Sequence, residues 1–398
     1  MIKFDQKRQP RRHAVAIAAT VLLLAFILYM VRVASIVPGF EISDELGGNI
    51  FPSTVISVAT TDAQIIKPSY SLFIGNPKSG IAIRIKPRHA DSRVRIEIEE
   101  TPFFSRSVTE FHLEKSGKEY TLYPDIIWDY EALKSNKQPT PVNIVANVEL
   151  DERALGQRVR TLSLRSINEC LLGYVSSDGS FHDTGVFFAA YVNEENPLID
   201  QILREALDTR IVNRFIGYQN GDSSNVDKQV YALWNVLQRR RFRYSSISNS
   251  ALSSNIVYSQ RVRTFNDSFE SSQINCVDGS VLFASLLRAI NIEPVLVRTP
   301  YHMFVGYYTD SSHTKINFLE TTMIGDVDLD DFFPDEKLDS AMAGKTQNQM
   351  SLFTYQKSKE YANRKYQESK EEIHSGKPNY LFLKISRDVR KEIQPVGR

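Results

Sequence analysis

The 398-residue chain contains only two cysteines, Cys170 and Cys276. Two cysteines are too few for a disulfide framework or for a cysteine-rich zinc or iron–sulfur site. The seven histidines are dispersed and form no pair with metal-ligand spacing, so we expect neither a metal nor another cofactor. The formal net charge is only +1, which gives no reason to expect a nucleic-acid partner. The length suffices for one membrane segment and about two globular domains.

Long apolar runs are also scarce, and the one that stands out is at residues 14–31. It carries no charge and is long enough to cross the hydrocarbon core as a helix. Basic residues precede it, namely Lys3, Lys7, Arg8, Arg11 and Arg12. This excess predicts a cytoplasmic stub at 1–13, a transmembrane helix in the lipid bilayer at 14–33 and a linker at 34–50. The rest of a single-pass membrane protein would then be periplasmic or extracellular. A cleavable signal peptide, cut near Ala34, stays open as an alternative.

Residues 51–192 have the pattern of a β-rich domain. Short apolar or alternating runs recur, and we predict strands at 55–59, 81–85, 94–98, 143–150, 159–164 and 186–192. Turn-forming pieces such as Gly75-Asn76-Pro77 separate them. Several short strands with such turns favour a β-sandwich, and nothing in this region suggests chemistry.

From residue 193 onward the apolar spacing becomes helical. Helices are predicted from about 197 to 207, after the pair Asn196-Pro197, and from about 225 to 241. Residues 356–373 mix acids and bases and predict a solvated helix with ion pairs between its side chains. A final strand is expected at 380–385. We therefore expect a second domain, 193–398, that ends in a charged helix and a strand.

Cys276 comes immediately before a helical pattern that runs to about Ile290. At the first turn of a helix, unpaired backbone N–H groups and the positive dipole end stabilise a thiolate. Three strands are predicted after this helix, at 295–297, 303–308 and 315–319. If a three- or five-residue loop centred on Ser311 joins the last two strands, His302 and Glu320 lie directly opposite one another. The carboxylate then holds one imidazole nitrogen and leaves the other for the thiol.

Three segments together resemble the transglutaminase-like superfamily, whose core is shared with papain-like thiol enzymes. They are the run from Asn275 to Leu287, the run from Pro300 to Gly306, and Phe318-Leu-Glu-Thr-Thr. The resemblance covers roughly 195–345 and implies an α+β fold, here preceded by the β-sandwich and the transmembrane helix.

The resemblance also implies roles for individual residues. Cys276 becomes the nucleophile, His302 the general base and acid, and Glu320 the group that orients the imidazole. Many family members have Asp where this chain has Glu320, and Asp326 is the fallback acid. The backbone N–H of Cys276 is a candidate oxyanion donor, with Gln273 or Gln260 as candidates for a side-chain amide.

The expected function is a membrane-anchored cysteine enzyme that acts on amide bonds of proteins or peptides near the membrane. Hydrolysis and acyl transfer both stay open, because either water or an amine can resolve a thioester. A scaffold protein that keeps the fold without turnover is the alternative. A disulfide between Cys170 and Cys276 would remove the nucleophile. The sequence does not indicate an oligomeric state.

Overall fold

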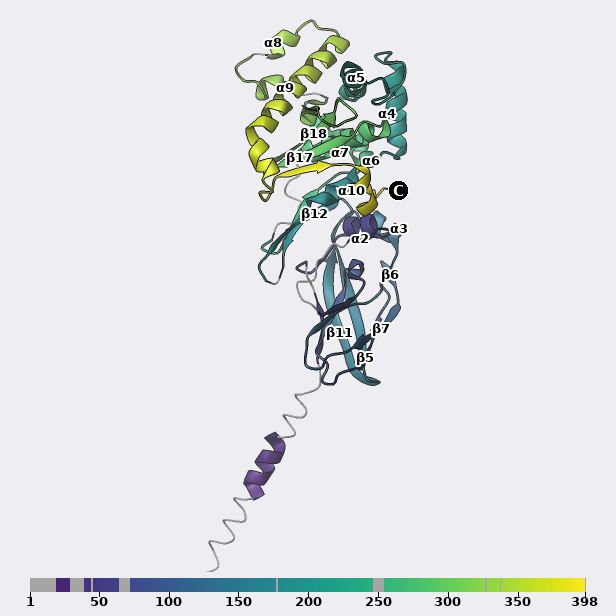
Figure 1. Ribbon diagram of the computed structural model, residues 1–398, viewed down its shortest axis with the longest axis vertical. Helices are drawn as coiled ribbons and strands as arrows, with labels where there is room; N and C mark the ends of the chain where they lie inside the picture. Colours follow the sequence, from purple (N-terminus) through teal and green to yellow (C-terminus); the bar gives the residue numbers. More distant parts are fainter. Residues whose placement is uncertain are drawn as a thin grey trace, which may run out of the picture.

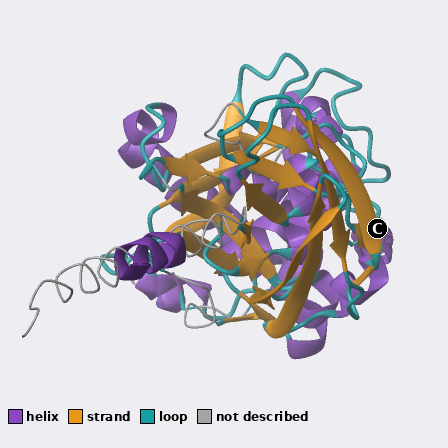
Figure 2. Ribbon diagram, turned by 90° about the horizontal axis from the view of Figure 1, so that it is seen from below, coloured by secondary structure: helices purple, strands orange, loops and turns teal. Residues whose placement is uncertain are grey.

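The computed structural model describes residues 19–28, 39–43, 46–63, 72–176, 178–245, 254–325, 328–336 and 338–397. They form a mixed α+β structure with several sheets. Figure 1 shows a strand-rich part and, above it, a mixed helical part. In the end-on view of Figure 2, helices and strands both occupy the body of the molecule.

The expected transmembrane segment lies only partly within the described residues. Residues 19–28 are helical, and residues 14–18 and 29–33 of the predicted span fall outside the description. Among the helices that the structure describes, none combines the length and the apolar character needed to cross a membrane.

Two sheets whose apolar faces share one core make up the strand-rich part. One is β1 (Phe40–Ser43), β4 (Ala82–Ile85), β8 (Tyr120–Tyr123) and β3 (Phe73–Gly75), in that order. The other is β2 (Asn49–Ile50), β11 (Arg153–Leu164), β10 (Thr140–Leu150), β5 (Ser92–Ile98) and β7 (Ser107–Leu113). Inward side chains of both sheets, such as Ile83, Val94 and Ile144, are fully buried. This is the arrangement of a β-sandwich, and the strands predicted at 81–85, 94–98, 143–150 and 159–164 are confirmed.

Short elements complete this part of the chain. They are α2 (Pro52–Val58), η1 (Pro77–Ser79), β6 (Phe104–Ser105), β9 (Ile127–Trp128) and α3 (Tyr130–Ser135). The strand predicted at 55–59 is wrong, because α2 occupies these residues with Pro52 in its first turn. Nearly every residue of α2 is buried. An apolar run of this length has no periodicity that separates a buried strand from a buried helix.

A second correction concerns residues 186–192. The predicted strand is instead the 3₁₀-helix η2 (Gly185–Tyr191), which is buried along nearly its whole length. Its side chains join the core of the following domain and not that of the sandwich. The sandwich core ends at Leu164, and Ile167 already belongs to the second core. The two cores therefore separate earlier in the chain than the domain boundary expected at residue 192.

The second part contains two sheets that matter for the site. β13 (Phe181–Asp183), β12 (Glu169–Val175) and β15 (Val257–Arg261) form the first, which lies between the two ends of the molecule (Figure 1). The second is antiparallel, in the order β19 (Ile316–Leu319), β18 (His302–Tyr308), β17 (Pro294–Thr299) and β20 (Leu381–Lys384). The strands expected at 295–297, 303–308, 315–319 and 380–385 are thus present.

Helices pack around the second sheet. The predicted helices after Pro197, near 225–241 and after Cys276 are α4 (Pro197–Asp208), α5 (Ser223–Arg239) and α7 (Cys276–Ala289). The remaining elements are β14 (Arg243–Tyr244), α6 (Phe265–Ser271), β16 (Gln273–Ile274), η4 (Thr321–Met323), η5 (Leu329–Asp331), α8 (Leu338–Met342), α9 (Gln347–His374) and α10 (Arg387–Glu392).

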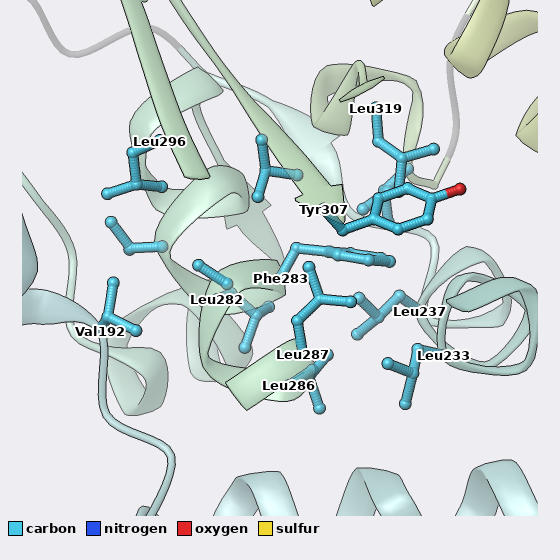
Figure 3. Close-up of a cluster of buried hydrophobic side chains, with 14 of the residues drawn as sticks. Val192, Leu233, Leu237, Leu282, Phe283, Leu286, Leu287, Leu296, Tyr307 and Leu319 are labelled. Carbon is cyan, nitrogen blue, oxygen red and sulfur yellow. The ribbon is translucent and has the colours of Figure 1, made fainter. Parts of the chain in front are cut away.

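The core beneath α7 fixes this helix between the sheet and α5. Figure 3 shows Phe283 and Leu287 of α7 between Tyr307 of β18 and Leu233 and Leu237 of α5. Phe283, Leu287 and Tyr307 are fully buried. The helix α7, whose first residue is Cys276, is therefore held by a continuous apolar core.

Candidate active site

Cys276 is the first residue of α7, as the sequence predicts. The side chain of Asn275 caps the helix by accepting hydrogen bonds from the backbone N–H groups of Val277 and Asp278, both at 2.8 Å. The side chain of Asp278 accepts in return from the backbone N–H of Asn275 at 3.0 Å, which completes a capping box. Cys276 is a free thiol and is half-buried at this helix end.

Asp278 also joins this helix end to a buried arginine. Its carboxylate lies 2.6 Å from a guanidinium nitrogen of Arg263 and accepts from the backbone N–H of Arg263 at 2.8 Å. Both side chains are almost inaccessible to solvent. Burial raises the pKa of Asp278, while the hydrogen bonds from Arg263 and Asn275 act against this shift. The spacing of Asn275 and Asp278 was the available sequence signal for this support of the helix start.

His302 and Glu320 meet, although their strands pair in another register than the one predicted. Imidazole Nε2 lies 2.5 Å from a carboxylate oxygen of Glu320. The predicted register would set Val305 opposite Asn317, whereas Val305 pairs with Leu319. A shift of two residues keeps the same side chains on the same face. It places Glu320 diagonally from His302, at a separation that a long side chain can span.

Several contacts hold Glu320 in place. The side chain is fully buried and accepts hydrogen bonds from the backbone N–H of Thr322 at 3.0 Å and from its hydroxyl at 2.6 Å. The hydroxyl of Ser358, on α9, accepts from the backbone N–H of Glu320 at 2.8 Å. Sequence reasoning missed Ser358, because the predicted helix at 356–373 was expected to be solvated. Serine on its buried face gives no apolar periodicity.

The charges at the site favour a protonated His302. Burial opposes the charged ring, but hydrogen bonding to Cys276 and Glu320 outweighs it and raises the pKa of His302 to about 10. The bond to Glu320 uses Nε2, which leaves Nδ1 for the sulfur. The thiol group of Cys276, the imidazole of His302 and the buried side chain of Glu320 therefore form one chain of contacts.

A glycine sets the distance between α7 and the segment after Glu320. A Cβ atom added to Gly279 would lie 2.7 Å from the hydroxyl oxygen of Thr321 and 2.9 Å from its Cβ. Real Cβ atoms do not approach other atoms this closely. The helix that carries Cys276 and the 3₁₀-helix η4 can pack this tightly only because residue 279 has no side chain.

The sulfur and the ring open into a cleft of about 270 Å³. Gln260 also lines it, from β15, and so does Arg298 from β17. Gln273 does not line this cleft but a separate depression beside Asp267, and its side chain is exposed. Asp326, the fallback acid, lies outside the described residues. Tyr301, at the rim of the cleft, is 98% exposed.

Neither cysteine is in a disulfide. Cys170 and Cys276 are both free thiols, and Cys170 is completely buried on β12. Burial raises the pKa of the Cys170 thiol far above its usual value, so this sulfur is neutral. Among the residues described, no group of three or more His, Cys, Asp or Glu side chains is placed to hold a metal ion.

No family model matches this chain, and no curated protein matches its sequence significantly. The site is therefore interpreted from its own geometry, in which a thiol and an imidazole line one cleft and a buried carboxylate contacts the imidazole.

Proposed function

We propose that the chain is a transglutaminase-like cysteine enzyme that acts on amide bonds of proteins or peptides. The observation that carries this proposal is the contact of His302 with both Cys276 and the buried Glu320 in an open cleft. A nucleophile, a base in hydrogen-bond reach and a third group that orients the base constitute a catalytic triad. The three residues come from separate segments, each of which resembles a transglutaminase-like motif.

The reaction begins with attack of the Cys276 thiolate on the amide carbonyl carbon, which forms a C–S bond. The C–N bond then breaks, and the His302 imidazolium gives its Nδ1 proton to the departing amine. This leaves a thioester on Cys276 and a neutral imidazole. Water or a second amine attacks the thioester and gives a proton to His302, and the thiolate departs. Water yields hydrolysis and an amine yields acyl transfer.

Two groups are suited to stabilise the oxyanion of the tetrahedral intermediate. The backbone N–H of Cys276 is at the start of α7, where N–H groups have no partner within the helix itself. The amide of Gln260 lines the same cleft and donates to the carbonyl of Arg261 at 3.0 Å, which uses one of its two hydrogens. We assign these two donors to the oxyanion hole.

We also propose that residues 14–33 anchor the enzyme in a membrane, with the cytoplasmic stub at 1–13 and the folded domains outside. Support comes from the uncharged run and the basic residues before it. Proteins or peptides near the membrane surface are then the natural substrates.

Labelling with iodoacetamide at pH 6 to 7, followed by peptide mapping, tests the nucleophile. We expect Cys276 to be modified much faster than an ordinary thiol, because the imidazole of His302 is in reach to take the proton of the thiol. Activated acyl esters should give a thioester on the same residue, which hydroxylamine removes. Cys276→Ala should lose both modifications.

Cys170→Ala is the matched control, because it removes the other sulfur from a buried position with no role in the proposed reaction. It should label like the wild type. If Cys276 in the folded wild type reacts no faster than a free thiol and forms no thioester, the enzyme proposal fails. A scaffold role then becomes the better interpretation.

A further inference from the structure

Arg298 is a buried cation beside the proposed nucleophile. It is on β17, next to Thr299, which pairs directly with His302. Only 8% of Arg298 is exposed, yet it is one of the residues that line the cleft with Cys276. A guanidinium keeps its charge at any physiological pH, so the cleft contains a fixed positive group with five donor hydrogens.

The guanidinium of Arg298 is poorly paired. Its buried Nε–H group donates no hydrogen bond to any of the described residues. Its ion-pair partner, Asp183, lies at 3.8 Å, which is longer than a hydrogen bond. Asp183 is also partly exposed and accepts from the backbone N–H of Gly185 at 2.7 Å. A buried cation in this state is costly unless a partner completes its hydrogen bonds.

Cys170 adds no charge to the pair of Arg298 and Asp183. Cys170 is close enough to feel the charge of Arg298, but its buried thiol is neutral. A second pocket, of about 250 Å³, shares Leu172, Arg298 and Asn379 with the cleft. Phe181 and Tyr258 line it, with ring centroids 6.2 Å apart. Arg298 thus stands where the cleft at Cys276 meets an aromatic pocket.

We infer that Arg298 binds a carboxylate of the substrate beside the amide that Cys276 attacks. The inference rests on the proposed function and deepens it, because it selects anionic acyl donors among proteins and peptides. A carboxylate matches the planar fork of a guanidinium and would satisfy its buried donors. The carboxylate can be an acidic side chain or a chain terminus, and these two sources share one chemistry.

Three affinity labels test the inference. Two carry a carboxylate at different positions, and the third carries none. They are bromoacetyl-Glu-amide with a side-chain carboxylate, bromoacetyl-Gln with a terminal carboxylate, and neutral bromoacetyl-Gln-amide. We expect at least one anionic label to alkylate Cys276 about tenfold faster than the neutral one, as a charge-assisted hydrogen bond predicts. The faster anionic label identifies the source of the carboxylate.

Arg298→Gln should abolish this preference while Cys276 still reacts with the neutral label. The matched control is Arg261→Gln, which removes the same charge from an arginine that lines the separate depression at Gln273. It should keep the wild-type preference. Asp183→Asn removes the competing carboxylate and should raise the preference, and this variant does not disturb a buried residue.

The outcomes separate the two proposals. If Cys276 reacts with no label faster than a free thiol does, the proposed function fails and the inference fails with it. If Cys276 reacts rapidly but with equal rates for all three labels in the wild type, only the role of Arg298 is overturned. The role of Arg298 is also overturned if folded Arg298→Gln still prefers the anionic label, or if this preference falls in Asp183→Asn.

Discussion

The β-sandwich and the domain that follows it bury different kinds of side chain. In the described part of the sandwich the buried polar residues are neutral, and its core is otherwise apolar. The second domain buries five charged residues, namely Glu169, Arg263, Asp278, Arg298 and Glu320. Burial of a charge opposes folding unless partners compensate it. Four of these five lie at or next to the cleft or support the start of α7, so the buried charges gather around the proposed site.

Two ion pairs make the contrast concrete. Arg106 and Glu97 in the sandwich approach to 2.7 Å, and Arg263 and Asp278 in the second domain approach to 2.6 Å. In the sandwich pair Arg106 is exposed and Glu97 is partly exposed, whereas both side chains of the second pair are buried. Distance alone therefore does not measure what an ion pair does, because water screens one pair and not the other.

The largest expected effect comes from breaking the buried pair. Arg263→Met leaves Asp278 buried without its charge partner and should lower the free energy of unfolding by about 3–5 kcal/mol. Urea denaturation measures this loss. Arg106→Met is the control in the sandwich and should change the stability little, because its pair is screened.

The loss in Arg263→Met should depend on pH. The pKa of Asp278 is already raised by burial, and it rises further when the charge of Arg263 is removed. An unfolded aspartate titrates near pH 4, so below about pH 4 the carboxyl is protonated in both states and the penalty is small. The free energy of unfolding of Arg263→Met should therefore fall as the pH rises above about 4. If Arg263→Met and Arg106→Met lose the same free energy of unfolding at all pH values, the contrast between the buried pair and the sandwich pair is wrong.

A smaller effect is expected from adding one methyl group where α7 meets η4. Gly279→Ala forces Thr321 away and should cost about 1–3 kcal/mol in strain, more than the roughly 1 kcal/mol that alanine contributes to a helix. The rate of Cys276 alkylation should fall with it, because the helix that carries the sulfur shifts. Denaturation and iodoacetamide kinetics measure the two effects.

Gly39→Ala, at the start of the sandwich, is the matched control for this change. A Cβ at Gly39 meets nothing within 4 Å, so stability and alkylation should stay close to those of the wild type. Adding Thr321→Ala to Gly279→Ala removes the closest atom and should restore part of the loss. If the two single glycine variants behave alike, the close approach at Gly279 has no importance.

The smallest free-energy change concerns the proton on His302. Glu320→Gln removes the buried charge that helps raise the pKa of His302 to about 10. The imidazolium loses its proton as the pH rises through this pKa. In the variant the pKa of His302 should be lower by at least about one unit, which corresponds to about 1.4 kcal/mol of lost stabilisation of the protonated ring. NMR titration of the imidazole measures the shift.

Glu97→Gln in the sandwich removes a carboxylate that pairs with Arg106 at 2.7 Å and should leave the titration of His302 unchanged. Coinciding titration curves for the wild type and Glu320→Gln would show that the contact at 2.5 Å does not control the imidazole.

Local patterns predicted much of the fold. Alternation in 94–98 and helical spacing after Cys276 were sufficient, because each element has one buried face or a marked start. The runs at 55–59 and 186–192 were mispredicted as strands because they are buried on nearly all sides, which removes any period. The buried face of α9 was missed because serine and threonine occupy part of it.

By itself, the sequence determined which residues could form the site and where Cys276 stands on its helix, because capping and dipole effects act over a few neighbouring residues. Only the tertiary structure decided the pairing of Val305 with Leu319 and the contact of Glu320 with His302. The same holds for the hydrogen bond from the backbone N–H of Glu320 to Ser358 and for the burial of Arg298. These depend on register, loop length and packing between distant segments. No local pattern encodes such long-range terms, because each residue's environment is set by elements far away in the chain.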